Sequence, residues 1–116
     1  MSSSFRDLQV WQRAIQTSVA IYRLTAGFPK EETYCLTSQL RRAGVSVASN
    51  IAEGYGRGTR GEYKQFLAIA RGSILEVQTQ LVIATELGFG DPEALIATTR
   101  LSEEVSKMLY ALLQKL

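Results

Sequence analysis

The chain has no histidine and a single cysteine, Cys35, and both shortages narrow the chemistry open to it. Without histidine there is no Ser-His-Asp or Cys-His catalytic site and no histidine-containing zinc site. One cysteine cannot form a disulfide within the chain. Only carboxylate or lysine chemistry is left for catalysis. Cys35 lies in the apolar run Tyr34-Cys35-Leu36, where we expect a small, buried side chain of the core.

Long apolar segments are also missing. No uninterrupted apolar run comes near the roughly 18 residues that a membrane-spanning helix needs. The first ten residues, MSSSFRDLQV, lack the hydrophobic segment of a secretory signal. We therefore expect a cytoplasmic protein with no membrane partner.

The chain has little excess of either charge. It contains 13 Lys and Arg residues and 11 Asp and Glu residues, which gives a net charge of +2. The distribution is less even. Between residues 41 and 71 there are two acids, Glu53 and Glu62, and six basic residues: Arg41, Arg42, Arg57, Arg60, Lys64 and Arg71. These six are candidate phosphate contacts, since clustered cations favour polyanions.

The composition is that of an ordinary globular domain. Hydrophobic residues make up 46% of the chain and charged residues 21%. A length of 116 residues suffices for one core but not for separate cofactor and substrate domains. We expect a single domain over residues 1–116.

The spacing of apolar residues by three and four predicts two helices in the first half of the chain. The first runs from Leu8 and ends at Gly27-Phe28-Pro29, where glycine can form a left-handed cap and proline cannot continue the helix. The second begins among the charged residues 30–32 and runs to Gly54. The core positions expected in these helices are Leu8, Trp11, Ile15, Val19, Tyr22, Leu36, Leu40, Ala43, Val47, Asn50 or Ile51, and Gly54.

Helix-start signals predict two further helices. Thr59-Arg60-Gly61-Glu62 has the form of a capping box, and Asp91-Pro92 supplies an N-cap followed by a proline at the first helical position. The core positions expected here are Tyr63, Phe66, Ala70, Ile74, Val77, Leu81, Ala84, Leu95, Leu101, Val105, Leu109, Leu112 and Leu116. Four such helices with short connections indicate an all-α fold, an antiparallel up-down four-helix bundle.

The stretch Gly56-Arg57-Gly58-Thr59-Arg60-Gly61 matches the dinucleotide-binding pattern G-x-G-x-x-G. That pattern holds a pyrophosphate only between a β-strand and a helix, and a helix is predicted before it here. We therefore expect a turn between helices and no cofactor. Two interpretations of its basic residues stay open. A solvated basic turn is favoured, and an anion contact at the following helix N-terminus is the alternative.

Asn50 and Glu53 are polar residues near the end of the second predicted helix, and Asn50 falls on its core-facing track. We expect both to be structural, bonding to the glycine-rich turn or to an arginine such as Arg41 or Arg42. A lone carboxylate without a partner is a poor active site, so no catalytic residue and no metal ligand is expected. A track of small residues on the same helix would let another helix approach closely: Gly44, Ala48 and Ala52.

Most aromatic residues fall on helical stripes. Trp11, Tyr22, Phe66 and Tyr110 are expected in the core. Phe5, Tyr55 and Tyr63 are less clear. Tyr55 adjoins the basic turn and could stack on a base, although packing against a neighbouring helix is favoured.

Several strings together resemble the 23S ribosomal RNA intervening-sequence protein family over nearly the whole chain: FRDLQVWQRA, FPKEE, QLRRAGVSVASNIAEGYGR and EYKQFLAIARGSILEVQTQL. The most specific residues are Arg41, Arg42, Ala43, Ser46, Asn50, Ile51, Ala52, Glu53, Gly54, Gly56 and Arg57, then Phe66, Leu67, Ala70, Gly72, Ser73 and Glu76. The resemblance implies a four-helix bundle that assembles as a homopentamer, with RNA or DNA as partner and no enzyme activity.

A related branch, the accessory variability determinant proteins of diversity-generating retroelements, is similar in fold and is associated with a reverse transcriptase. We therefore expect a non-catalytic, oligomeric accessory protein that binds RNA or DNA electrostatically, without reading bases. Subunit contacts are expected to use the Ala/Gly track of the second helix and the remaining apolar positions of the first three. One alternative is a protein–protein interaction scaffold, and another is a small enzyme or cofactor binder in the bundle core.

Overall fold

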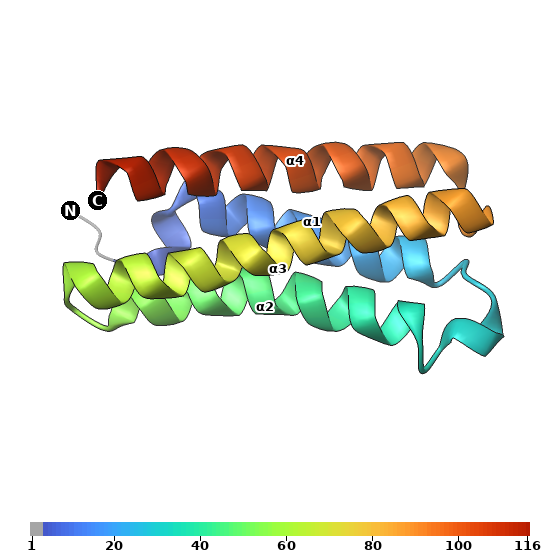
Figure 1. The fold of residues 1–116 in the computed structure, drawn as a ribbon, viewed down its shortest axis with the longest axis horizontal. Helices are drawn as coiled ribbons and strands as arrows, with labels where there is room; N and C mark the ends of the chain where they lie inside the picture. Colours follow the sequence, from blue (N-terminus) through green and yellow to red (C-terminus); the bar gives the residue numbers. More distant parts are fainter. Residues whose placement is uncertain (1–3) are drawn as a thin grey trace.

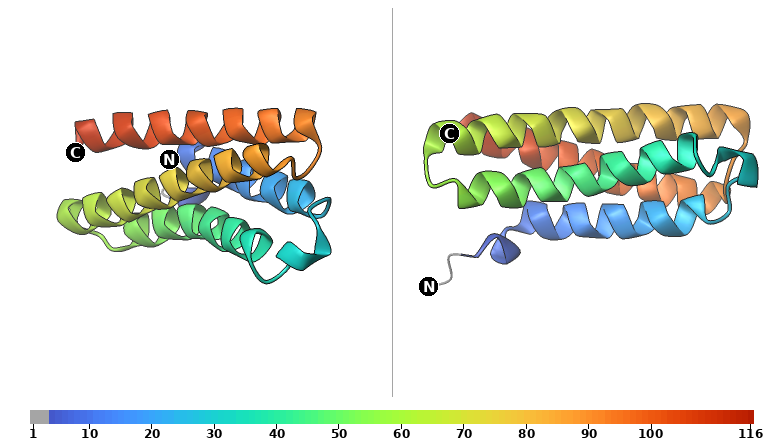
Figure 2. Two further views of the ribbon diagram at one scale, coloured as in Figure 1. Left: turned by 45° about the vertical axis from the view of Figure 1, so that its right-hand side comes forward. Right: turned by 90° about the horizontal axis from the view of Figure 1, so that it is seen from below.

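The computed structural model describes residues 4–116 as four long α-helices and two short 3-10 helices (Figure 1). In chain order the elements are η1 (Phe5–Asp7), α1 (Gln9–Thr25), η2 (Lys30–Glu32), α2 (Leu36–Gly56), α3 (Arg60–Leu87) and α4 (Pro92–Lys115). Successive α-helices run in opposite directions, as Figures 1 and 2 show. Helix α1 packs on α2 and α4, and α3 packs on the same two helices. The all-α, up-down four-helix bundle is thus confirmed.

The bundle is elongated, with principal extents of 43 × 24 × 22 Å. One end, which we call the turn end, carries the glycine-rich turn between α2 and α3, residues 56–61 (Figure 1). The other end, the connection end, carries the link between α1 and α2, residues 26–35, and the turn between α3 and α4, residues 88–91.

The predicted starts of α3 and α4 agree with the structure. The Thr59 hydroxyl accepts from the backbone N–H of Glu62 at 3.2 Å, and an Asp91 carboxylate oxygen accepts from that of Ala94 at 2.9 Å. Helix α3 ends at Leu87, and its C-cap, Gly88, has a left-handed backbone with φ +73°. These contacts satisfy amide and carbonyl groups that helix ends leave free.

The boundary between the first two helices differs from the prediction. Helix α1 ends at Thr25 with a right-handed cap at Ala26, and Gly27 has no positive φ. The charged residues 30–32 form η2, and α2 begins later, at Leu36. The backbone N–H of Leu36 donates to a Glu32 carboxylate oxygen at 3.1 Å, so this acid caps the helix from outside it.

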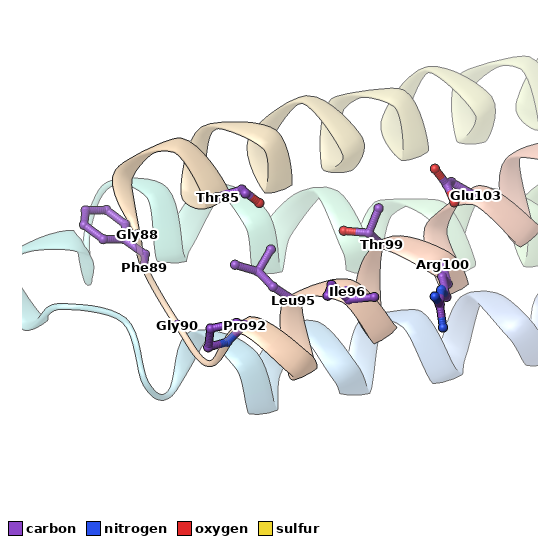
Figure 3. A pocket seen from close by; sticks show the side chains of 10 residues that line it. All are labelled: Thr85, Gly88, Phe89, Gly90, Pro92, Leu95, Ile96, Thr99, Arg100 and Glu103. Atoms are coloured by element: carbon purple, nitrogen blue, oxygen red, sulfur yellow. The ribbon is translucent and has the colours of Figure 1, made fainter.

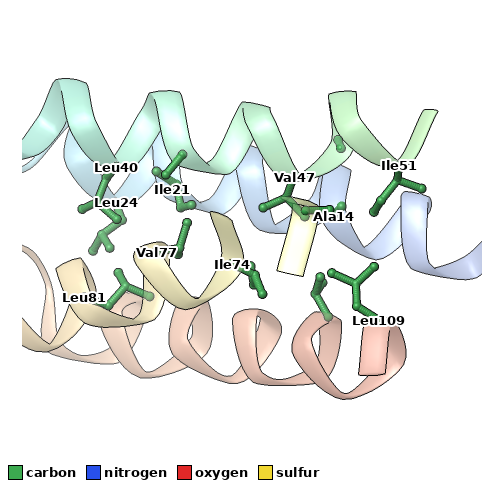
Figure 4. Packing of buried hydrophobic residues seen from close by; sticks show 14 of the residues in the cluster. Ala14, Ile21, Leu24, Leu40, Val47, Ile51, Ile74, Val77, Leu81 and Leu109 are labelled. Carbon is green, nitrogen blue, oxygen red and sulfur yellow. The ribbon is translucent and has the colours of Figure 1, made fainter. Parts of the chain in front are cut away.

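Buried aliphatic side chains from all four helices form one continuous core (Figure 4). In α1 the core face is not the predicted stripe, because Ile15, Val19 and Tyr22 are 37–45% exposed. The buried α1 residues are Val10, Ala14, Thr17, Ser18, Ile21, Leu24 and Thr25. Adjacent residues on a helix are separated by about 100° of rotation, so a neighbouring stripe of smaller side chains faces inward instead.

Close packing between α1 and α2 explains this choice. A Cβ atom placed on Gly44 would lie 2.8 Å from the Ile21 side chain and 3.7 Å from the Ser18 backbone. Small residues on both helices are therefore needed where they meet. Gly44 is buried at this contact, Ala48 is buried as well, and Ala52 is half-buried. Contrary to the prediction, Gly44 and Ala48 offer no free surface for a subunit contact.

The sequence pattern missed other core residues for two reasons. Some have a larger apolar neighbour in the sequence, and others are themselves polar. Leu67 is fully buried, whereas Phe66 is half-buried. Thr98 and Ser102 are buried in α4, where their hydroxyls donate to the backbone carbonyls of Ala94 and Thr99. A hydroxyl that bonds to its own helix can be buried at little cost.

Helix α3 resembles a membrane-spanning helix in its length and composition. It has 28 residues and an 18-residue window of mean hydropathy 1.3, so length and composition alone would let it cross a membrane. Core helices of soluble proteins meet the same criterion. Arg71 and Glu76 interrupt its apolar sequence, and Leu67, Ile74 and Val77 are buried against the other helices. These three residues face the bundle core, and the cytoplasmic location stays a prediction.

Candidate nucleic-acid interface

The glycine-rich turn joins two helices directly. Gly56 is the last residue of α2, Gly61 lies in the first turn of α3, and only Gly58 between them has a positive φ, +90°. A helix therefore delivers the chain to the turn, where a dinucleotide site requires a strand. The turn geometry is that of a helix-to-helix connection.

Three of the six candidate cations belong to this turn end, and they are not equivalent. Arg57 donates to a Glu53 carboxylate oxygen at 3.0 Å, lies 3.9 Å from a Glu62 carboxylate oxygen, and places its guanidinium 4.8 Å from the centre of the Phe66 ring. Its charge is largely balanced by these two acids. Arg60 and Lys64 are exposed and make no hydrogen bond, ion pair or ring contact within residues 4–116. They are the free cations of the turn.

Arg41 and Arg42 are neighbours near the start of α2, yet only one is free. The Arg41 guanidinium donates to the Thr25 hydroxyl at 2.8 Å and to the Tyr22 carbonyl at 3.3 Å, and it lies 4.6 Å from the centre of the Tyr22 ring. It therefore ties α2 to the last turn of α1. Arg42 is exposed and has no such contact with any residue between 4 and 116.

Arg71 lies in the middle of α3 and is half-buried. Its guanidinium is 5.5 Å from the centre of the Tyr110 ring on α4, and its Nε is buried without a hydrogen-bond partner. Arg71 therefore contributes to the contact between α3 and α4.

The six basic residues do not form one patch. Arg42 on α2 and Arg57, the C-cap of α2, are 15 positions apart, which corresponds to about 22 Å along the helix. The free cations thus lie at two separate places, Arg60 and Lys64 at the turn end and Arg42 toward the connection end. One long strand, or several copies of the chain, would be needed for simultaneous contact.

Asn50 and Glu53 occupy different environments. Asn50 is half-buried, and its amide donates to the carbonyl and the hydroxyl of Ser46 at 2.8 and 3.0 Å. Ile51, rather than Asn50, takes the core position. Glu53 is exposed and pairs with Arg57 of the glycine-rich turn, not with Arg41 or Arg42.

The expectation of core positions for Tyr22 and Tyr110 is wrong, since both are about half exposed and cover the arginines described above. Trp11 and Phe66 are half-buried, and Phe5 packs edge-on against Trp11. Tyr55 packs edge-on against Tyr63 at a centroid distance of 5.9 Å. Burial raises the pKa of the Tyr63 phenol above its ordinary value, and Tyr55 raises it further. Tyr55 therefore packs on a helix, as favoured from the sequence.

The prediction that Cys35 is buried is also wrong. Cys35 is exposed, and Tyr34 beside it is 93% exposed. The apolar run was misleading because the chain reaches α2 through a turn, and only Leu36 of the three points inward.

A polar pocket of about 480 Å³ opens between α2 and α3 and was not predicted. Its lining residues are Tyr34, Ser38, Gln39, Arg42, Ala43, Ser46, Ser73 and Glu76. Six of these residues stand in the strings that carry the family resemblance. The sequence held no signal for their convergence, because about 30 positions separate the two helical segments.

A second, apolar pocket of about 390 Å³ lies at the connection end, against the turn between α3 and α4 (Figure 3). Phe89, Pro92, Leu95 and Ile96 line it, with Arg100 and Glu103 at one side. Leu95 also belongs to the bundle core, and Phe89 packs against that core. Within residues 4–116 no three cysteine or acidic side chains gather closely enough to hold a metal ion.

Comparison with known proteins places the fold in a family. A family model described as 23S rRNA-intervening sequence protein matches residues 6–111. A solved structure, a protein of unknown function from the S23 ribosomal protein family of Bacteroides thetaiotaomicron, has a TM-score of 0.80 at 20% sequence identity. The match covers 90% of this chain and 97% of that one. At this identity the likeness shows the fold alone. No curated protein matches the chain.

Proposed function

This chain belongs to the family of 23S rRNA-intervening sequence proteins, and on that premise we propose that it is a non-catalytic, oligomeric accessory protein that binds RNA or DNA. The observation that carries the proposal is the set of free cations within the basic segment, residues 41–71: Arg42, Arg60 and Lys64. Each is exposed and unpaired in the part of the chain that the structure describes. Cations without an internal partner can neutralise phosphates without first breaking an ion pair.

Assembly would make this modest charge effective. A net charge of +2 on one chain gives weak long-range attraction, but several copies would place many free cations along one strand. The outward apolar stripe of α1, Ile15, Val19 and Tyr22, together with Val45 of α2, supports a subunit contact. Five subunits, and a reverse transcriptase as a further partner, follow from the family resemblance rather than from these residues.

Binding measured over a series of salt concentrations tests the proposal. Apparent affinity for RNA and DNA should fall linearly with salt on logarithmic axes, with a slope of about 0.9 for each duplex phosphate neutralised. The Arg60→Ala/Lys64→Ala variant should bind more weakly and with a smaller slope. Arg57→Ala should change binding less, because Glu53 and Glu62 already balance that charge.

Lys107→Ala, an exposed lysine of α4 outside the basic segment, serves as the matched control and should bind like the wild type. Unchanged binding by the folded Arg60→Ala/Lys64→Ala variant would remove the turn from the interface. Failure of the wild type to bind either nucleic acid at low salt would favour the alternative function, a protein–protein scaffold. The exposed apolar residues of α1 and α2 support that alternative.

A further inference from the structure

The polar pocket between α2 and α3 has a floor fixed by hydrogen bonds. The hydroxyls of Ser46 and Ser73 lie 3.0 Å apart, and the Asn50 amide donates to Ser46. At the other side, the buried Gln80 amide donates to a Glu76 carboxylate oxygen at 3.3 Å and to the Gln39 side-chain oxygen at 3.4 Å. The Glu76 carboxylate is therefore held in place while the pocket stays open to solvent.

Tyr34 stands at the rim of this pocket. Its side chain is 93% exposed, so packing within the chain does not account for its position. Together with Ser38 and Arg42 it also lines an adjoining hollow of about 460 Å³ on the α1 side. A solvated aromatic ring between two hollows offers a face on which a planar ligand can stack.

Two opposite charges line the pocket without neutralising each other. No ion pair or hydrogen bond joins Arg42 to Glu76, and Arg42 has no partner at all within residues 4–116. A ligand that bonds to both groups presents N–H donors to the carboxylate and an acceptor to the guanidinium. Guanine has this pattern, with N1–H and N2–H beside O6 and N7. Uracil and thymine offer one ring N–H, and adenine and cytosine offer one amino group beside an acceptor.

We propose that this pocket binds an unpaired guanine of a single-stranded RNA or DNA segment. The base stacks on Tyr34, its N1–H and N2–H donate to Glu76, and Arg42 donates to O6, N7 or the adjoining phosphate. A paired guanine is excluded, because its Watson–Crick edge is occupied in a duplex. The inference rests on the proposed function and adds base readout to it. The sequence did not predict base readout, because the residues that would contact the base come together only when α2 packs on α3.

Fluorescence anisotropy with labelled short strands tests this site. The probes are a uridine-rich strand with one central guanosine, the same strand with uridine in its place, and the guanosine strand annealed to its complement. The guanosine strand should bind about tenfold more tightly than the uridine strand, since a well-formed bidentate contact discriminates by that order. The duplex should show no guanine-dependent gain.

Substitutions assign the effect to the pocket. Tyr34→Ala should weaken binding of the guanosine strand about tenfold, whereas Tyr34→Phe should retain it, because stacking needs the ring and not the hydroxyl. Glu76→Gln should abolish the preference for guanosine over uridine. Glu86→Gln, at an exposed acid of the same helix outside the pocket, is the matched control and should keep it. Circular dichroism checks that each variant is folded.

The outcomes distinguish the guanine site from the broader proposal that the chain binds nucleic acid. Salt-dependent binding that is equal for both single strands and unaffected by Tyr34→Ala would overturn the guanine site and leave the proposed function standing. Absence of binding to any strand by the wild type would overturn both. A guanosine preference that survives Glu76→Gln would also contradict the assignment.

Discussion

At the scale of single residues, Asn50 and Glu53 lie less than one turn apart on α2 but have different surroundings. Asn50 is half-buried and bonds to Ser46, whose hydroxyl in turn meets Ser73 of α3. Glu53 is exposed and holds one ion pair on the protein surface. Only the first of these links contributes to the contact between α2 and α3.

Replacing these residues should show the difference. Asn50→Ala should lower the free energy of unfolding by about 1 kcal/mol, because it removes partly buried hydrogen bonds. Glu53→Gln should change it by less than about 0.5 kcal/mol, since exposed ion pairs contribute little. Urea unfolding of both variants measures this. Equal effects would mean that the Ser46–Asn50–Ser73 cluster does not stabilise the helix contact.

Single residues were also where sequence reasoning failed most. Ile15, Val19 and Tyr22 form a regular apolar stripe, and nothing in the spacing shows that Ala14 and Thr17 lie inside instead. That choice depends on how closely α2 approaches at Gly44, which is a property of two helices. Tyr34 and Cys35 were misplaced for a related reason, because an apolar run in a turn need not face the core.

At the scale of helices, ends are governed by local chemistry, and here the sequence was more informative. The caps at Thr59 and Asp91 depend on side chains within three residues of the helix start, so the pattern alone predicted them. The C-cap of α3, Gly88, is also determined locally, because a left-handed backbone strains any residue with a Cβ atom. The late start of α2 was missed, because Glu32 caps it from a preceding 3-10 turn.

Two glycines of α3 make a matched pair for this argument. Gly88 has φ +73°, so Gly88→Ala should destabilise the protein by about 1 kcal/mol. Gly72 lies within the helix, with no atom within 4 Å of an added Cβ, so Gly72→Ala should stabilise it by about 0.5 to 1 kcal/mol. Thermal unfolding compares the two. Shifts of the same sign would contradict the cap assignment.

At the scale of the whole molecule, the fold was predictable and the surfaces were not. Four amphipathic segments with short connections have few ways to pack other than an up-down bundle. The distribution of free cations and the polar pocket depend on side chains from different helices, which no local pattern reports. Arg41 and Arg42 are alike in the sequence, but the bundle ties Arg41 to α1 and leaves Arg42 free. Arg57 pairs locally, with Glu53 four residues before it.

The outward stripe of α1 gives a test of assembly. If it forms a subunit contact, Ile15→Lys/Val19→Lys should reduce the molar mass measured by light scattering toward that of one chain. The charges would then be buried without partners on association. Ile96→Lys, at an exposed apolar residue of α4, should leave the mass unchanged. A wild type that is monomeric at all concentrations would contradict the oligomer.

The up-down order of the helices also has a kinetic consequence. Three of the four helix contacts join segments that follow each other in the chain, and only the contact between α1 and α4 closes the ring. This contact joins the two helices that are farthest apart in the chain. Forming it closes the longest segment of chain and therefore has the largest entropic cost. An exposed ion pair across it, Arg13 to Glu104 at 3.0 Å, offsets little of this cost. Along this seam the bundle should open most readily, with α2 and α3 still paired.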